Sequence, residues 1–196
     1  MIFETLQIIR EEANAYLKSV GGTADITLNN VATLDQADNE DMSGSGSNIL
    51  CTLVNIQEEF ALKNVTNNRI VGGTVDYRNP KVHLNLYVLY SFVHGTYTEA
   101  LKGLNRIVQF YQGKRVFTQS NTSFKREAEM SDLVSFKFVV DLYTPSFEEL
   151  NYIWGTLGGK QYPSVMYKIS VLEIEREHSL RKSGTVVGLT SDLNNN

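Results

Sequence analysis

The histidines and the single cysteine are the side chains of this sequence best suited to bind a metal or attack a substrate, but their spacing supports neither chemistry. His83, His94 and His178 lie far apart, and none has a second histidine or cysteine at the spacing of a zinc site. We expect His83 to face solvent or a partner. Cys51 lies in an apolar run, residues 49–54, where a thiol packs as a small hydrophobe. A lone cysteine also excludes an intramolecular disulfide.

The carboxylates are not arranged for metal binding or for acid–base catalysis. The acidic stretch at residues 35–41 lacks the alternating acids, the glycine and the closing glutamate of a calcium loop. Glu58 and Glu59 are adjacent in the chain, as are Glu148 and Glu149, so the members of each pair point to different faces. We expect residues 35–41 to form a solvated acidic loop.

Signals for phosphate binding and for serine hydrolysis are also missing. The glycine pairs at residues 21–22, 72–73 and 158–159 belong to no phosphate-binding motif and are typical of turns and helix ends. Ser131 and Ser164 are not set in a Gly-x-Ser-x-Gly turn. We therefore predict that the chain is not an enzyme and that it holds no cofactor and no metal.

Tyrosines give the one direct indication of function. The chain has ten, and alternation or helical period predicts that Tyr87, Tyr97, Tyr152 and Tyr162 point outward. Exposed tyrosines without convergent acids or bases are typical of protein–protein contact surfaces. To these candidates for an interface we add a set of basic side chains, namely Arg115, Lys125, Arg126, Arg176, Arg181 and Lys182.

Three helices are expected to position these residues. Apolar residues recur with helical period over residues 2–20, until a glycine pair ends the run. Two further helices begin at capping boxes, where Thr96 is followed by Glu99 and Ser146 by Glu149. In the last helix Trp154 falls on the apolar side, so we expect it in the core.

Strands are expected between these helices, at residues 24–28, 49–56, 82–92, 115–118, 134–143 and 165–174. The polar stretch 57–79 is expected to contain an edge hairpin. This order predicts an α+β fold, with about three helices packed on one face of a mixed, mostly antiparallel sheet. We expect one domain over residues 1–175, flexible loops at 35–48 and 119–132, and a polar C-terminal tail at 176–196.

Composition and charge argue against further classes of function. The formal net charge of -4 and the pI near 5.4 argue against non-specific nucleic-acid binding, which needs clustered Lys and Arg. The N-terminal segment carries acids early and lacks the layout of a signal peptide. No apolar run approaches the roughly 20 residues of a spanning helix. We therefore expect a chain that is made and folded in the cytoplasm and is not inserted into a membrane.

Three segments, in this order, carry a resemblance to a known family. The first, residues 48–64, begins NILCTLVNIQEE. The second, residues 79–117, contains NPKVHLNLYVLYS and QFYQGKRVF. The third, residues 143–167, contains YTPSFEELNYIW and YPSVMY. Together they resemble the tail-terminator, or cap, proteins of extracellular contractile injection systems of the antifeeding-prophage and Photorhabdus virulence cassette type.

This resemblance implies a structural role. Such a protein forms a ring, expected to be a homohexamer, on the distal end of the inner tube, where it ends tube and sheath polymerisation and anchors the last sheath ring. The implied partners are other copies of the chain, the inner tube protein and the sheath protein. The loops at 35–48 and 119–132 and the tail are expected to reach them. Assembly would take place in the bacterial cytoplasm, and the protein would then remain part of the injection particle.

Two other readings of the sequence stay open. One is a tail completion or neck protein of an ordinary phage tail, which belongs to the same structural class. The other is a small cytoplasmic adaptor that binds proteins.

Overall fold

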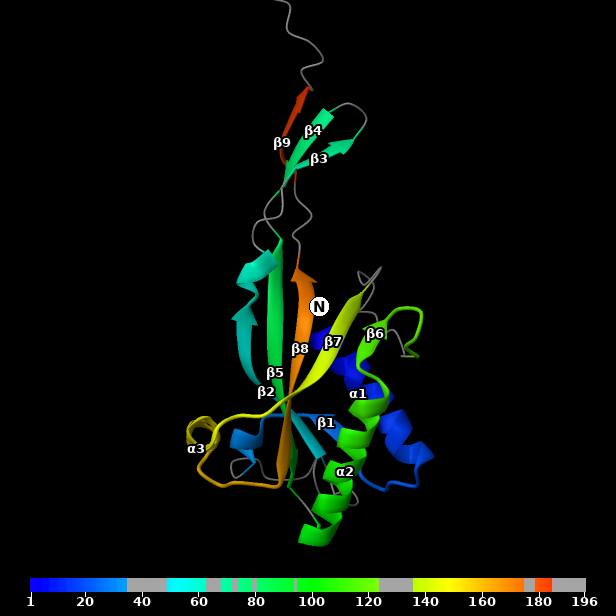
Figure 1. Cartoon of the computed structure of the whole chain (residues 1–196), viewed down its shortest axis with the longest axis vertical. Helices are drawn as coiled ribbons and strands as arrows, with labels where there is room; N and C mark the ends of the chain where they lie inside the picture. Colours follow the sequence, from blue (N-terminus) through cyan, green and yellow to red (C-terminus); the bar gives the residue numbers. More distant parts are fainter. Residues whose placement is uncertain are drawn as a thin grey trace, which may run out of the picture. The chain divides into compact units, whose positions relative to one another are not determined.

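The structure, a computed structural model, describes most of the chain and divides it into two compact units, which are treated separately below (Figure 1). The first unit comprises Met1–Glu58 and Leu84–Leu172, and the second comprises Glu59–His83 and Glu173–Asn196. The described residues are 1–34, 49–62, 68–71, 74–78, 81–93, 95–123, 136–174 and 179–184.

Three helices form, and the second and third begin where the capping residues predict. The three α-helices are α1 (Ile2–Ser19), α2 (Tyr97–Gly113) and α3 (Phe147–Thr156), and single 3-10 turns lie at η1 (Val31–Thr33) and η2 (Phe60–Leu62). Both predicted capping boxes are confirmed. The hydroxyl of Ser146 accepts the N–H of Glu149 at 3.2 Å, and the Glu149 carboxylate accepts the N–H of Ser146 at 2.8 Å. Each box satisfies two amides that have no partner inside the helix.

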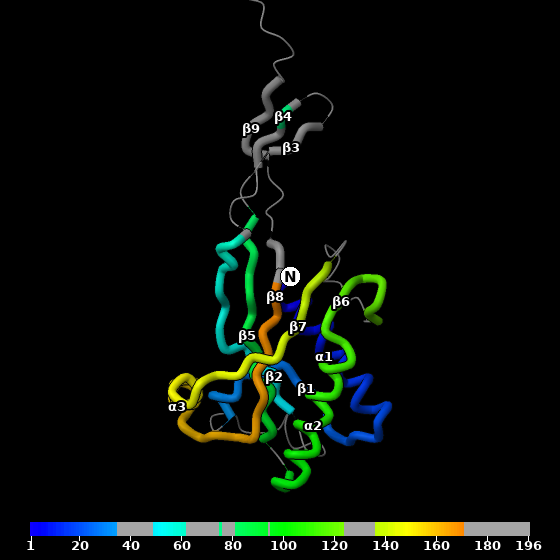
Figure 2. The backbone as a smooth tube through the Cα atoms, viewed as in Figure 1, coloured from blue at the N-terminus to red at the C-terminus, as the bar shows by residue number. Residues whose placement is uncertain are grey.

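A six-stranded sheet forms the centre of the first unit, with strand order β1-β2-β5-β8-β7-β6 (Figure 2). Its strands are β1 (Ile26–Leu28), β2 (Ile49–Glu58), β5 (Val82–Phe92), β6 (Val116–Thr118), β7 (Lys137–Tyr143) and β8 (Ser164–Ile174). The short strand β1 pairs with β2 in parallel, whereas the β2–β5, β6–β7 and β7–β8 pairs are antiparallel. The predicted α+β class with a mostly antiparallel sheet is confirmed.

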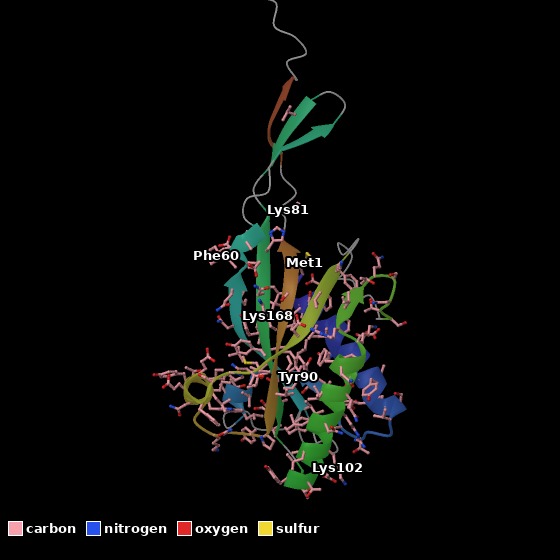
Figure 3. All side chains as sticks on the ribbon, viewed as in Figure 1. Met1, Phe60, Lys81, Tyr90, Lys102 and Lys168 are labelled. Atoms are coloured by element: carbon pink, nitrogen blue, oxygen red, sulfur yellow. The ribbon has the colours of Figure 1, made fainter. Side chains whose placement is uncertain are left out.

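Both faces of this sheet are covered by helices, so the prediction of helices on one face is wrong. Successive side chains of a strand point to opposite faces. Val88 and Tyr90 of β5 therefore pack with residues of α1 and α2, whereas Leu89 packs on the other face with Trp154 of α3. Figure 3 labels Tyr90 inside the first unit. The predicted core position of Trp154 is confirmed, since its side chain is 4% exposed and lies in the α3 cluster. Helical period shows which side of α3 is apolar, but it does not show which face of a sheet will cover it.

The described part of the second unit is a three-stranded antiparallel sheet with strand order β3-β4-β9. The hairpin of β3 (Asn68–Val71) and β4 (Thr74–Arg78) belongs to this sheet, and not to an edge of the larger one as predicted. The strand β9 (Ser179–Gly184) was not predicted and falls in the expected tail. A polar strand such as β9 is stabilised by its backbone pairing with β4, which hydrophobic patterning cannot reveal.

Candidate functional site

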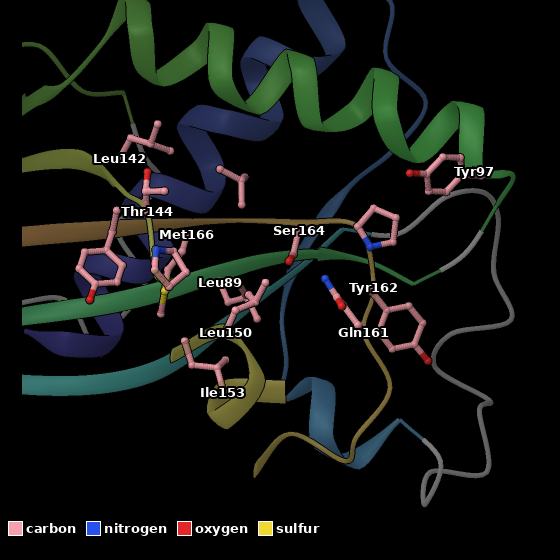
Figure 4. Close-up of a pocket in the computed structure, with 14 residues that line it drawn as sticks. Leu89, Tyr97, Leu142, Thr144, Leu150, Ile153, Gln161, Tyr162, Ser164 and Met166 are labelled. Atoms are coloured by element: carbon pink, nitrogen blue, oxygen red, sulfur yellow. The ribbon is translucent and has the colours of Figure 1, made fainter. Parts of the chain in front are cut away.

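An apolar groove lies in the first unit, between the start of α2 and α3, where β7 ends (Figure 4). Its volume is about 590 Å³. The residues that line it are Leu89, Tyr97, Leu142, Tyr143, Thr144, Pro145, Leu150, Ile153, Gln161, Tyr162, Pro163, Ser164, Val165 and Met166. As far as the described residues define the groove, its lining carries no charge.

The groove exists because β7 is shorter than its neighbour β8. The register of the two strands ends at the pair Tyr143–Met166. Pro145 follows and has no backbone N–H with which to continue a ladder. The chain leaves the sheet there and enters α3 through the Ser146 cap. The first residues of β8, beginning at Ser164, therefore extend beyond the end of β7.

The backbone of Ser164 faces the space left by β7. The N–H of Phe92 donates to the carbonyl of Pro163 at 3.0 Å, so residue 163 directs its carbonyl toward β5. Along a strand the backbone groups of successive residues point to opposite sides, so the N–H and C=O of Ser164 point away from β5. No described residue lies in register with Ser164 on that side. The groove therefore presents one unpaired backbone donor and one unpaired acceptor.

Apolar side chains form the two walls of the groove. Tyr97 and Leu142, on the α2 side, are 71% and 56% exposed, and Leu150 and Ile153 of α3 form the opposite wall (Figure 4). Phe147, one turn before Leu150 on the same side of α3, is 91% exposed. Large exposed apolar side chains that lie together mark sites of contact with other proteins.

Tyr143 connects the groove to the polar part of the same sheet face. Its hydroxyl donates to Glu149 Oε1 at 3.3 Å, and its ring meets Tyr87 edge-on, with 5.0 Å between ring centroids. Desolvation and then the neighbouring Glu149 carboxylate raise the pKa of Tyr143. Tyr87 in turn donates its hydroxyl to Gln57 Oε1 at 2.9 Å. These contacts fix the tyrosines in place and provide no group poised for catalysis.

The residues that the sequence singled out as interface candidates are only partly brought together. Tyr97 and Tyr162 line the groove, and Tyr87 lies beside it through Tyr143. Tyr152 is 72% exposed on α3, outside the groove lining. Arg115 forms an exposed ion pair with Asp141, of a kind that contributes little to stability.

Five of the basic candidates are not placed with their side chains. Lys125, Arg126 and Arg176 lie outside the described residues. Arg181 and Lys182 belong to β9, in register with Tyr77 and Asp76 of β4. An interface role for the ten candidates therefore stays a prediction.

Leu142, Ser164 and Val165 were not predicted as parts of a surface. Leu142 and Val165 fall in expected strands, and strand patterning cannot tell where a neighbouring strand stops. The signal that could have located the groove is Pro145, because proline interrupts strand pairing. His83 is a different error: its side chain is 9% exposed, so the expectation that it faces solvent or a partner is wrong. His94 and His178 lie outside the described residues.

Asparagine side chains cap both outer strands of the large sheet. Asn14 of α1 accepts the outward N–H of Ile26 at 2.7 Å and donates to the C=O of Ile26 at 3.1 Å. At the other edge Asn121 accepts the N–H of Thr118 at 2.8 Å and donates to the C=O of Val116 at 2.9 Å. Edge strands with free backbone groups invite pairing with other chains. The two asparagine side chains therefore bond to backbone N–H and C=O groups that an added strand would need.

Part of the outer edge of β2 extends beyond β1, and two local features interrupt it. The register shifts between Leu53 and Asn55, which is the mark of a bulge. The N–H of Ile56 donates to Asn55 Oδ1 at 2.9 Å. Bulges and occupied backbone groups both hinder strand addition.

A partly buried ion pair holds the start of the predicted 119–132 loop against α1. Lys114 Nζ donates to Glu12 Oε2 at 2.6 Å and to the carbonyl of Asn121 at 2.5 Å. Glu12 Oε1 accepts the N–H of Ser123 at 2.5 Å. These contacts involve the described residues 119–123; residues 124–132 lie outside the described part, and the flexibility of the loop stays a prediction.

Replacing Glu12 by glutamine is expected to lower the free energy of unfolding by about 1–3 kcal/mol, because Lys114 would lose its charged partner. Urea unfolding followed by tryptophan fluorescence would measure the loss. Glu148→Gln, at an exposed position of α3, is the matched control and should change stability by less than about 0.5 kcal/mol. Equal effects of the two substitutions would contradict a structural role for the Glu12–Lys114 pair.

The buried cysteine lies in a network of tyrosines and is not set up as a nucleophile. Cys51 is 3% exposed, as the apolar run around it predicts. Burial raises the pKa of its thiol to about 12. The hydroxyls of Tyr90 and Tyr111 are hydrogen-bonded to each other, and burial raises the pKa of both groups well above 10. Because the thiolate is the reactive form, Cys51 is unreactive at neutral pH.

The described ranges contain no group of three His, Cys, Asp or Glu side chains close enough together to hold a metal ion. None of the helices there combines the length and the hydropathy that crossing a bilayer requires.

Comparison with known proteins identifies the family. The sequence profile of the Pvc16 N-terminal domain matches residues 4–187, and the chain belongs to this family. A search of curated proteins finds no match.

Solved structures share the fold at low sequence identity. One is the PVC sheath/tube terminator of an extracellular contractile injection system in its extended state, with a TM-score of 0.59 and 13% identity over 96% of this chain and 62% of that one. Another is the tube-terminating cap of the anti-feeding prophage, with a TM-score of 0.65 and 13% identity over 97% of this chain and 61% of that one. This chain thus spans about three-fifths of the length of either protein.

Proposed function

We propose that this protein is the cap, or tail terminator, of a contractile injection system. It would form a ring on the distal end of the inner tube, end the polymerisation of tube and sheath, and anchor the last sheath ring. The observation that carries the proposal is the family match over residues 4–187. The shared fold supports it, because the two similar structures are described as a sheath/tube terminator and a tube-terminating cap.

The edges of the large sheet fit a protein that stops growth. A terminator must bind the last ring of a polymer without offering a surface on which the polymer continues. Asn14 and Asn121 occupy outward backbone groups of β1 and β6, so open-ended addition of strands at these edges is disfavoured. We infer separately that contacts between copies are heterologous and close into a ring, as the cap function requires.

The cap would act together with other proteins of the particle. We infer a homohexameric ring whose partners are the inner tube protein and the sheath protein. The role would be structural and not enzymatic, in line with the lack of a catalytic constellation in the sequence. The protein would assemble in the bacterial cytoplasm and remain on the particle. The loops at 35–48 and 119–132 and the segment that follows β9 are candidates for reaching neighbouring copies, the tube or the sheath.

Deleting the gene in the producing organism tests the proposal. Electron microscopy would measure the length distribution of sheath–tube particles in the deletion strain and in the same strain carrying the gene on a plasmid. We expect the deletion strain to lack particles or to form tubes of uncontrolled length, because nothing closes the growing end.

The plasmid copy should restore particles of uniform length. Particles of normal length with intact sheaths in the deletion strain would refute the cap function and favour an adaptor that binds proteins elsewhere. Genes for capsid and terminase beside this one would favour a phage neck protein instead.

A further inference from the structure

We propose that the groove beside Ser164 binds residues 185–191 of a neighbouring copy as an added β-strand. This inference rests on the proposed cap function, because the ring of caps supplies the neighbouring copy. The added strand would lie in the groove in line with β7, and the donated segment would link each subunit to the next.

The groove has the three properties that an added strand requires. The N–H and C=O of Ser164 point into the space where a longer β7 would lie, and they can pair with one residue of an extended chain. Apolar walls stand on both sides of that line, with Leu142 on the α2 side and Ile153 on the α3 side (Figure 4). Side chains of an extended segment alternate between two sides, so each wall would receive every second side chain.

Because the groove lining carries no charge, the segment that binds there should be uncharged as well. A Lys, Arg, Asp or Glu entering the groove would lose water without gaining an ionic partner. Among the stretches outside the described residues, 185–191 is uncharged and rich in β-branched side chains, with the sequence TVVGLTS. The other uncharged stretch of this length, 42–48, consists mainly of Gly and Ser, which are poor strand formers.

The pattern of the segment matches the two walls. In an extended chain Val187 and Leu189 point to one side and Val186 to the other. The segment directly follows β9, which ends at Gly184. It therefore leaves a strand of one copy and would enter a sheet of the next, as in other complexes that are completed by a donated strand.

Cysteine cross-linking in the full chain tests the proposal. Chains that carry Leu142→Cys and chains that carry Val187→Cys are produced together in the deletion strain, and both the purified protein and isolated particles are oxidised. Cys51 can stay in place because its thiol is buried and protonated. Lys137→Cys, at the exposed far end of β7, replaces Leu142→Cys as the matched control.

We expect a disulfide-linked dimer of the two variants on non-reducing gels, in a yield about tenfold above the Lys137→Cys control, because a bound segment has a high effective concentration. A free peptide of sequence TVVGLTS should lower that yield. No dimer above the control in either sample would overturn the proposal. So would a cross-link from position 142 to sheath or tube protein, or, in a Leu142→Cys/Val187→Cys chain, a cross-link confined to one chain.

Failure of this proposal is distinguishable from failure of the cap function. Particles of uniform length restored by the plasmid copy, together with no cross-link between copies, would keep the cap function and reject the donated strand. Cross-linked copies together with normal particles in the deletion strain would keep the donated strand as a contact between copies and reject the cap.

Discussion

Replacing Phe117 by alanine is expected to lower the free energy of unfolding by about 3–5 kcal/mol, the range for removing a buried aromatic side chain. Phe117 is fully buried, and its ring stacks on Phe138 with 5.1 Å between centroids. It also lies 6.2 Å from the ring of Phe110 in α2. β6 has three residues, so Phe117 supplies most of the apolar contact that holds this edge strand to the sheet. Urea unfolding would measure the loss.

The structure supplies both a control and an independent probe for this experiment. Val116→Ala, at the neighbouring position of the same strand, removes a side chain that is 42% exposed and should cost less than about 1 kcal/mol. Trp154 is the single tryptophan and packs on the opposite face of the sheet. If the sheet unfolds as one unit, tryptophan fluorescence and circular dichroism will give the same midpoint shift. A Phe117→Ala loss no larger than that of Val116→Ala would contradict the assigned packing.

Raising the pH above 9 is expected to destabilise the first unit steeply. Burial raises the pKa of Cys51 from 9.0 to about 12 and that of Tyr167 from 10.0 to about 12, and it raises the pKa values of Tyr90 and Tyr111 as well. The folded state therefore keeps protons that the unfolded state releases, so the stability that they provide falls as the pH rises. Each group contributes up to about 1.4 kcal/mol per pH unit.

The pH range and the steepness of the fall in stability follow from the individual titrating groups. Cys51 acts from pH 9 to about 12, and the tyrosines act above pH 10, so the fall in stability becomes steeper above pH 10. Urea unfolding at pH 7, 9, 10 and 11 would measure it. Cys51→Ala should flatten the fall between pH 9 and 10, whereas Tyr152→Phe, at an exposed site, should leave it unchanged. An unchanged slope in Cys51→Ala would contradict the assignment.

Local signals predicted most of the elements correctly. The capping boxes at Thr96 and Ser146 set the starts of α2 and α3, because a cap depends on residues within one helical turn. The alternating run through Leu86, Val88 and Tyr90 predicted β5, since a long apolar alternation has few other solutions. The family was indicated by the resemblance that three segments carry in order, and the sequence profile confirms it.

Other features could not be predicted because they depend on residues distant in the chain. β9 has no apolar alternation, and its pairing with β4 joins segments about a hundred residues apart. The groove arises because β7 is too short to cover the first two residues of β8, Ser164 and Val165. This depends on the relative length and the register of the two strands. Asn14 and Asn121 look like ordinary polar residues until the strands they cap are in place.

The sequence by itself therefore determined the helices, the strands of the large sheet, the burial of Cys51 and Trp154, and the family. Only the tertiary structure decided which face of the sheet α3 covers, that a second small sheet forms, and that Ser164 faces an open groove. The physical reason is the range of the interactions. Caps and hydrophobic periods act between residues close in the chain, whereas strand order, register and the pairing of backbone groups are set by contacts that form only when distant segments meet.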